Sequence, residues 1–96
     1  MKNHEEILSL LRQAKPHLKA KWGVEHVAVF GSVARNEQTP TSDVDLIVDF
    51  SMPLSWGFFD LIDELEALLE SKVDVISRKQ IKPKAWGYIA DEVIDV

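Results

Sequence analysis

The segment 43–50 (DVDLIVDF) constrains the fold most, because its residues alternate between two kinds of side chain. Successive side chains of a β-strand point to opposite faces. One face of this strand therefore carries Asp43, Asp45 and Asp49, and the other carries Val44, Leu46 and Val48. The apolar run in the middle of the segment is typical of a central strand. A central strand with several carboxylates at its start needs partners for those charges.

The remaining elements are expected to alternate between helix and strand. Apolar residues at helical spacing predict a first helix over 7–14. Pro16 is interpreted as the first position of a second short helix over 17–21, and Gly23 as its end. Later segments predict strands over 24–30 and 72–76, a helix over 55–70 with Ser55 as its N-cap, and a final helix over 83–94 with Trp86, Ile89, Ala90 and Val93 facing inward. This order predicts an α/β (α+β) fold, a small mixed sheet flanked by helices.

Composition and charge exclude several classes of protein. A chain of 96 residues fits one domain over 1–96, and 46% hydrophobic with 28% charged residues is ordinary for a globular protein. The absence of cysteine excludes disulfides, zinc thiolate sites and cysteine nucleophiles. With no signal-peptide core and no apolar run near the ~20 residues of a membrane span, a cytoplasmic protein is expected. The net charge of −5 disfavours stable, non-specific nucleic-acid binding.

The sequence Phe30-Gly31-Ser32 closes the first predicted strand. Glycine allows a backbone to approach a phosphate closely, and serine adds a hydroxyl donor. A helical turn beginning at Ser32 would also direct free N–H groups at an anion. Taken alone, this sequence is better explained as an ordinary turn at the end of a strand.

Three aspartates are the candidate metal ligands. Asp43 and Asp45 share a face and repel each other when ionised, and a divalent cation would relieve that repulsion. The alternative is a solvated strand start. Asp74 lies in an apolar strand and needs a partner, which a nearby Lys or Arg could equally supply. If the two strands are neighbours, the three carboxylates converge and suit a two-metal site.

These motifs together resemble those of a known family. Gly31-Ser32, ten residues, Asp43-x-Asp45 and a later strand aspartate are similar to the DNA polymerase β-type nucleotidyltransferase superfamily. The match is closest to its minimal nucleotidyltransferase branch, which includes the MntA-type antitoxins paired with HEPN toxins. The sequences 30–35 (FGSVAR), 42–46 (SDVDL) and 72–75 (KVDV), together with the helices at both ends, extend the resemblance over the whole chain.

The resemblance implies a role for each matching residue. Gly31 and Ser32 would hold the triphosphate of ATP, with Arg35 supporting the phosphates or the loop, although a solvated arginine is an equally good interpretation. Two Mg²⁺ ions would be bound by Asp43, Asp45 and Asp74, and Asp74 would act as or orient the general base. Family members usually have glycine after the arginine, where this chain has Asn36. Asparagine tolerates a positive φ better than most residues.

The implied activity is Mg²⁺-dependent transfer of AMP from ATP to a hydroxyl, expected to be a tyrosine, of a HEPN toxin. The short chain favours an acceptor that brings its own surface. Two alternatives remain, namely nucleotidylation of a small molecule and a non-catalytic module that inhibits its partner by contact. The sequence leaves homo- or hetero-oligomerisation open.

Other conspicuous residues receive no catalytic role. The three histidines (His4, His17 and His26) show no metal-ligand spacing, and Asp49 is expected to be solvated. The tryptophans (Trp22, Trp56 and Trp86) are interpreted as packing residues, with Trp56 the candidate for a contact with a partner. The lysines after the third strand (Lys79, Lys82 and Lys84) are interpreted as a solvated basic face.

Overall fold

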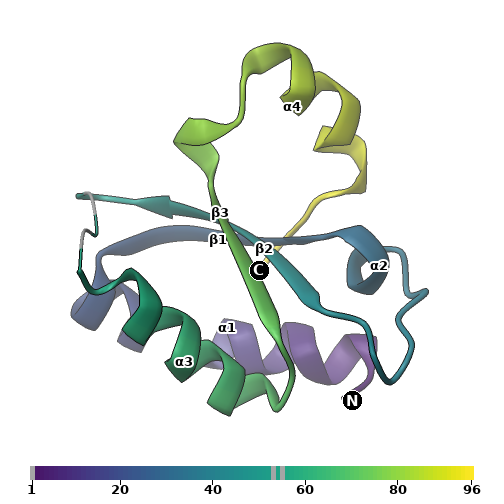
Figure 1. Cartoon of the computed structure of the whole chain (residues 1–96), viewed down its shortest axis with the longest axis horizontal. Coiled ribbons are helices and arrows are strands. Elements are labelled where there is room, and N and C mark those ends of the chain that lie inside the picture. Colours follow the sequence, from purple (N-terminus) through teal and green to yellow (C-terminus); the bar gives the residue numbers. More distant parts are fainter. Residues whose placement is uncertain (1, 53, 55) are drawn as a thin grey trace.

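The computed structural model describes residues 2–52, 54 and 56–96 and has a four-stranded mixed sheet at its centre (Figure 1). The strands are β1 (Val24–Phe30), β2 (Val44–Phe50), β3 (Val73–Ser77) and β4 (Ile94–Asp95), in the order β3-β2-β1-β4. Strand β2 is parallel to β3 and antiparallel to β1, which is antiparallel to β4. The expected mixed α/β fold, with a central strand over 43–50, is confirmed.

Helices lie on both sides of this sheet. Figure 1 shows α1 (His4–Trp22) and α3 (Phe58–Leu69) below it and α4 (Pro83–Ile89) above it. The short helix α2 (Gly31–Ala34) follows β1 directly. No helix in the described part of the chain is both long and apolar enough to cross a membrane.

The core lies between the sheet and the helices α1 and α3. It is built from the apolar stripe of each helix and the apolar face of each strand: Ile7, Leu11, Leu18, Val27, Val29, Val44, Leu46, Val48, Leu61, Leu65 and Leu69. Full burial of each such side chain contributes about 1.5–3 kcal/mol. The face of β2 that carries the aspartates is on the opposite side of the sheet, which leaves the carboxylates outside the core.

Helix α1 corrects the expectation of two helices separated at Pro16. It runs without interruption through Pro16, whose side chain is exposed. Proline removes one backbone hydrogen bond from a helix interior. Leu11 and Leu18 on either side are both buried against the sheet, and this burial offsets the lost bond. Gly23 ends the helix as expected, with φ 69° and its N–H donating to Leu18 O and Lys19 O.

The connection from β2 to β3 through α3 is a crossover between parallel strands. The helix begins at Phe58, with Gly57 as its N-cap, so it starts later than the expected 55–70. The proposed N-cap Ser55 is outside the described residues. A Cβ built at Gly57 would lie 3.0 Å from the Trp22 ring, so this glycine lets the start of α3 pack on α1.

The C-terminal segment corrects the expected helix over 83–94. Helix α4 ends at Ile89, a 3-10 turn covers Ala90–Glu92, and the chain finishes as the edge strand β4. The strand pairs with β1, and Lys15 Nζ donates to Val96 O at 2.6 Å. Pairing with an open sheet edge thus outweighs the local helical pattern. Helix α4 has no buried residue, and the four side chains expected to face inward are only half-buried.

Candidate active site

The carboxylates meet where β2 and β3 begin. In the parallel register Asp45 lies opposite Asp74, and Asp43 immediately precedes β2. Asp45 is half-buried, whereas Asp43 and Asp74 are exposed. Asp74 is exposed because β3 is an edge strand of the sheet, so solvent meets part of its need for a partner. The sequence left the order of the strands open, and the structure places β2 and β3 side by side.

Asp45 is the carboxyl group in this cluster whose pKa is shifted by its surroundings. Its pKa is raised above the ordinary value of 3.8, first by burial and then by the negative charges of Asp74 and Asp43. A hydrogen bond with the Asp74 carboxyl raises the pKa further, while the positive charge of Arg35 lowers it. Carboxylates that share a site in this way favour a bound proton or a bound cation.

Gly31 lies directly against Asp45. Phe30 pairs with Asp45 across β1 and β2, so the residue after Phe30 reaches the carboxylate. Gly31 has φ 74°, and a Cβ built there would overlap Asp45 Oδ2 and lie 3.3 Å from Cγ. Both the left-handed backbone and the close approach require glycine. The two motifs, eleven or more residues apart in the sequence, are thus one site in the structure.

The turn after Gly31 is held by its own backbone. The N–H of Arg35 donates to Gly31 O at 3.1 Å, and that of Glu37 donates to Ser32 O at 2.8 Å. Asn36 has φ 56°, so the asparagine adopts the left-handed conformation that a glycine would take. The departure from the family pattern is therefore accommodated by the loop.

A contact that the sequence did not indicate also supports this turn. His4 at the start of α1 donates its Nδ1–H to Val33 O in α2 at 2.5 Å, and the His4 side chain is only 16% exposed. The partners are 29 residues apart, and no local pattern reveals such a bond.

Arg35 is neither free nor buried. Its Nε donates to Glu37 Oε2 at 3.2 Å and its Nη1 donates to Glu92 Oε2 at 3.4 Å. These carboxylates, Glu37 first, raise the pKa of Arg35 above its usual value. The interpretation of Arg35 as a simple solvated arginine is therefore incomplete, because the side chain links α2 to the C-terminal segment.

The chemistry of the carboxylates fits a divalent cation. Mg²⁺ prefers oxygen ligands and is usually bound through one or two carboxylates together with substrate phosphates. Within residues 2–52, 54 and 56–96, no three His, Asp or Glu side chains lie close enough together to hold a metal ion by themselves. The raised pKa of Asp45 and the register of Asp45 with Asp74 fit a site that substrate oxygens would complete.

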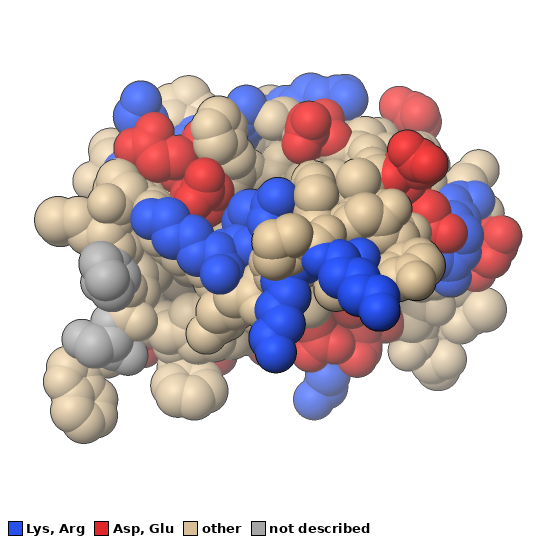
Figure 2. Space-filling view, turned by 90° about the horizontal axis from the view of Figure 1, so that it is seen from above, with Lys and Arg blue, Asp and Glu red and all other residues tan. Residues whose placement is uncertain are grey.

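Basic side chains gather near the open face of the sheet. Figure 2 shows Lys and Arg grouped across the middle of the face seen from above, with acidic groups beside them. The lysines of the predicted basic cluster (Lys79, Lys82 and Lys84) are all exposed. Next to them, Arg78 stacks on the Trp86 ring with 3.7 Å between its Cζ and the ring centroid. Arg78, Trp86 and half-buried Asp49 line a small hollow that also contains His26.

Trp22 and Trp56 differ in how deeply they are buried. Trp22 is half-buried against the core, and its Nε1–H donates to Glu64 Oε2 at 2.9 Å, so its packing role is confirmed. Trp56 is 92% exposed. The interpretation of Trp56 as a packing residue is wrong, and the suggestion that it contacts a partner stays a prediction.

Known proteins resemble this chain over nearly its whole length. The family model described as the nucleotidyltransferase domain matches residues 11–96. A Methanocaldococcus jannaschii protein named as a candidate protein adenylyltransferase is 44% identical, with 100% of both chains covered. The protein adenylyltransferase MntA of Thermococcus cleftensis is 39% identical, covering 96% of this chain and 94% of the relative.

Solved structures agree with the fold. A structure described as a candidate minimal nucleotidyltransferase superposes with a TM-score of 0.80 at 34% identity, covering 99% of this chain and 97% of that one. A tri-AMPylated Shewanella oneidensis HEPN toxin in complex with MNT antitoxin has a TM-score of 0.58 at 19% identity, covering 97% of this chain and 67% of that one, and shows the fold alone.

The family match and the fold define an α/β enzyme of the nucleotidyltransferase class. The chain belongs to the nucleotidyltransferase domain family, and the resemblance to its minimal branch is confirmed.

Proposed function

We propose that this enzyme transfers AMP from ATP to a hydroxyl of a partner protein of the HEPN toxin class, and that the transfer neutralises the toxin. The observation that carries the proposal is the meeting of Asp45, Asp74 and Gly31 at one end of the sheet. The names of the relatives, which are protein adenylyltransferases, support AMP as the group transferred.

Each site residue has a distinct role in this proposal. The backbone at Gly31 and the hydroxyl of Ser32 would hold the triphosphate, because only glycine leaves room beside Asp45. Arg35 would support the phosphates from the side of α2, since its guanidinium already influences Asp45. Asp43, Asp45 and Asp74 would hold Mg²⁺, which when bound offsets the negative charge of the triphosphate.

The reaction forms one bond to phosphorus and breaks another. The acceptor oxygen attacks the α-phosphorus of ATP, the bond from that phosphorus to the bridging oxygen breaks, and pyrophosphate leaves. Asp74 would accept or direct the hydroxyl proton, because its carboxyl is exposed on an edge strand that an incoming acceptor can reach. Asp45, half-buried between Gly31 and Asp74, would fix the geometry of the site.

A protein acceptor would supply part of the binding surface itself. The carboxylates of Asp43 and Asp74 are exposed on one face of the sheet. An acceptor with its own folded surface would complete such a site. The toxin–antitoxin complex with the same fold supports a HEPN-type partner, and a tyrosine hydroxyl is the acceptor we propose.

A second candidate function is inhibition by contact alone. The exposed aromatic side chains Trp56, Phe59 and Tyr88 favour it, since large exposed apolar groups are common at protein interfaces. The clustered carboxylates count against it, because a surface that only binds gains nothing from mutual repulsion.

Co-expression in cells separates the two functions. Asp43→Ala with Asp45→Ala removes two proposed metal ligands and is expected to abolish both protection from the toxin and its modification. The variant must retain its circular dichroism spectrum and co-purify with the toxin. Full protection by this folded variant would show that contact suffices and would contradict the catalytic proposal.

A further inference from the structure

The small hollow beside Arg78 and Trp86 lies on the same face of the sheet as the carboxylates. It has a volume of about 200 Å³ and is lined by His26, Ala28, Ile47, Asp49, Arg78 and Trp86. Side chains two residues apart on a strand share a face, so Ile47 and Asp49 continue the face of β2 that begins with Asp45. The hollow therefore extends the candidate active site along the sheet.

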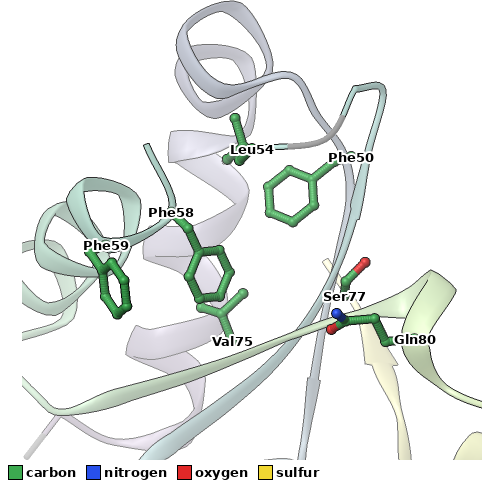
Figure 3. A pocket seen from close by; sticks show the side chains of 7 residues that line it. All are labelled: Phe50, Leu54, Phe58, Phe59, Val75, Ser77 and Gln80. Atoms are coloured by element: carbon green, nitrogen blue, oxygen red, sulfur yellow. The ribbon is translucent and has the colours of Figure 1, made fainter. Parts of the chain in front are cut away.

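A larger hollow, of about 490 Å³, lies on the other side of the sheet. Figure 3 shows that Phe58 of α3, Phe50 at the end of β2 and Val75 of β3 line it. Val75 follows Asp74 directly, and consecutive side chains of a strand face opposite sides. A nucleotide with its phosphates at the carboxylates can thus reach the small hollow without leaving its face of the sheet, but not the larger one.

Paired residues on this face form rows across the sheet. In the first row Asp45 pairs with Phe30 of β1 and with Asp74 of β3. In the next row Ala28 pairs with Ile47. Adjacent rows are about 7 Å apart, because a strand rises by about 3.3 Å per residue. The floor of the hollow therefore begins one row away from the carboxylates, an interval that a ribose can bridge.

The direction of the nucleoside follows from the proposed function, on which this inference rests. In phosphoryl and nucleotidyl transfer the attacking and leaving oxygens lie roughly in line on opposite sides of the phosphorus. Pyrophosphate would leave on the side of Gly31 and the acceptor would enter on the side of Asp74, so this line runs across the strands. The ribose is attached at a steep angle to that line. Of the directions open to it, the one along β2 keeps contact with the protein and leads to Ile47.

The lining of the small hollow suits an uncharged aromatic ring. Ala28 and Ile47 form an apolar floor, and Arg78 holds the Trp86 ring by a cation–π contact of 3.7 Å. The charges of Asp49 and Arg78 offset each other, so the lining does not favour an anion such as phosphate. Asp49 accepts hydrogen bonds and Arg78 donates them. The edge of a nucleobase carries both the donors and the acceptors that match.

We propose that this hollow is the nucleobase subsite, in which the base of the nucleotide lies over Ala28 and Ile47 and against Trp86. Proteins commonly bind unpaired bases by stacking them on aromatic side chains or guanidinium planes. The volume of about 200 Å³ is smaller than the roughly 300–1,000 Å³ of pockets that enclose a whole drug-sized ligand, and this size fits a single base. The C-terminal segment, through Trp86 of α4, then holds the base of the nucleotide whose phosphates lie at Gly31.

The test compares the binding of two probes to the full chain by isothermal titration calorimetry in the presence of Mg²⁺. The probes are ATP and ribose 5′-triphosphate, which differ only in the base. We expect ATP to bind at least about tenfold more tightly. Trp86→Ala should remove most of this difference and leave the affinity for ribose 5′-triphosphate unchanged. The matched control is Trp56→Ala, which changes a tryptophan that is 92% exposed beyond the other end of β2 and should alter neither affinity.

A second variant fills the hollow instead of removing its wall. Ala28→Leu leaves Trp86 and Arg78 in place but occupies the floor, and it should weaken ATP binding about tenfold without affecting ribose 5′-triphosphate. Circular dichroism verifies the fold of each variant, and either folded variant is sufficient for the comparison.

Three results would overturn the proposal: no detectable binding of ATP, equal affinity of the unmodified chain for the two probes, or an equal loss for both probes in the folded variants. Variants that keep their affinity for ATP but lose AMP transfer would assign the hollow to the acceptor side chain instead. The binding measurements use no partner protein, so ATP bound through the hollow without any transfer would overturn the proposed function alone.

Discussion

The Asp45 carboxylate lies so close to the backbone of Gly31 that no side chain fits at position 31. The backbone of Gly31 is left-handed at φ 74°, and a Cβ there would overlap a carboxylate oxygen of Asp45. The residue proposed to hold phosphate and the residue proposed to hold the cation are therefore constrained by one another. A change at one must disturb the other.

Substitution of Gly31 by alanine tests this relationship. We expect Gly31→Ala to destabilise the protein by roughly 1–2 kcal/mol, because the left-handed conformation is strained for alanine. Displacement of the Asp45 carboxylate should also reduce AMP transfer at least about tenfold. Gly87→Ala is the control, since Gly87 is helical and a Cβ there meets nothing within 4 Å. It should stabilise the chain by about 0.5–1 kcal/mol and leave transfer unchanged. Thermal melts measure the change in stability, and a transfer assay measures the change in activity. A fully active Gly31→Ala variant would show that Gly31 and Asp45 do not constrain each other.

Removal of the Asp45 charge is expected to raise the stability of the protein while abolishing its activity. The pKa of Asp45 is raised by burial and by neighbouring carboxylates, so its ionised form costs stability at neutral pH and the cost disappears below the ordinary value of 3.8. Asp45→Asn should therefore raise the thermal midpoint of the cation-free protein by a small amount, because solvent screens this partly exposed carboxylate, and should abolish transfer. Asp43→Asn changes an exposed carboxyl and should raise the midpoint less. A lower midpoint for Asp45→Asn would show that the site is not strained.

Arg35 is predicted to act on the nucleotide rather than on stability. Its ion pairs with Glu37 and Glu92 are exposed, and such pairs contribute little. Arg35→Ala should leave the thermal midpoint nearly unchanged but raise the KM for ATP by roughly tenfold. Arg35→Lys should restore part of that loss. Steady-state kinetics with varied ATP provide the measurement, and an unchanged KM would remove Arg35 from the nucleotide site.

Glu64 is predicted to make stability depend on pH. It joins α3 to α1 by accepting hydrogen bonds from Lys21 Nζ at 2.8 Å and Trp22 Nε1 at 2.9 Å. These bonds, that of Lys21 first, lower the pKa of Glu64 below its ordinary value of 4.5. The stabilisation is therefore complete above pH 4.5 and is lost as the pH falls through the lowered pKa.

Substitution of Glu64 tests the direction of this pH dependence of stability. Glu64→Gln should lower stability at neutral pH by roughly 0.5–1 kcal/mol, since the carboxylate is partly exposed and its interactions are screened. The difference from the unmodified chain should shrink at acid pH, as followed by melts across a pH series. Glu70→Gln, which affects only an exposed pair with Lys2, should have a smaller effect. A difference that grows at acid pH would contradict the assignment.

Local patterns in the sequence were enough to predict most of the helices and strands, whereas the proximity of the candidate site residues followed only from the resemblance to the family. The alternation over 43–50 defined the central strand, and the structure places its Asp45 opposite Asp74. Side-chain periodicity works here because the core face and the open face of β2 differ so strongly in chemistry.

Features that depend on distant contacts could not be predicted. Pro16 remains helical because Leu11 and Leu18 are buried on either side, and residues 94–95 form a strand because β1 offers an edge. The bond from His4 to Val33 O joins residues that no spacing rule connects. In each case tertiary packing outweighs a local propensity.

The most direct test of the proposed function is incubation of the chain with α-labelled ATP, Mg²⁺ and the product of the neighbouring gene. We expect label on the partner protein, release of pyrophosphate and loss of both with Asp43→Ala. Absence of label under conditions in which the two proteins still co-purify would contradict it and would leave inhibition by binding as the function.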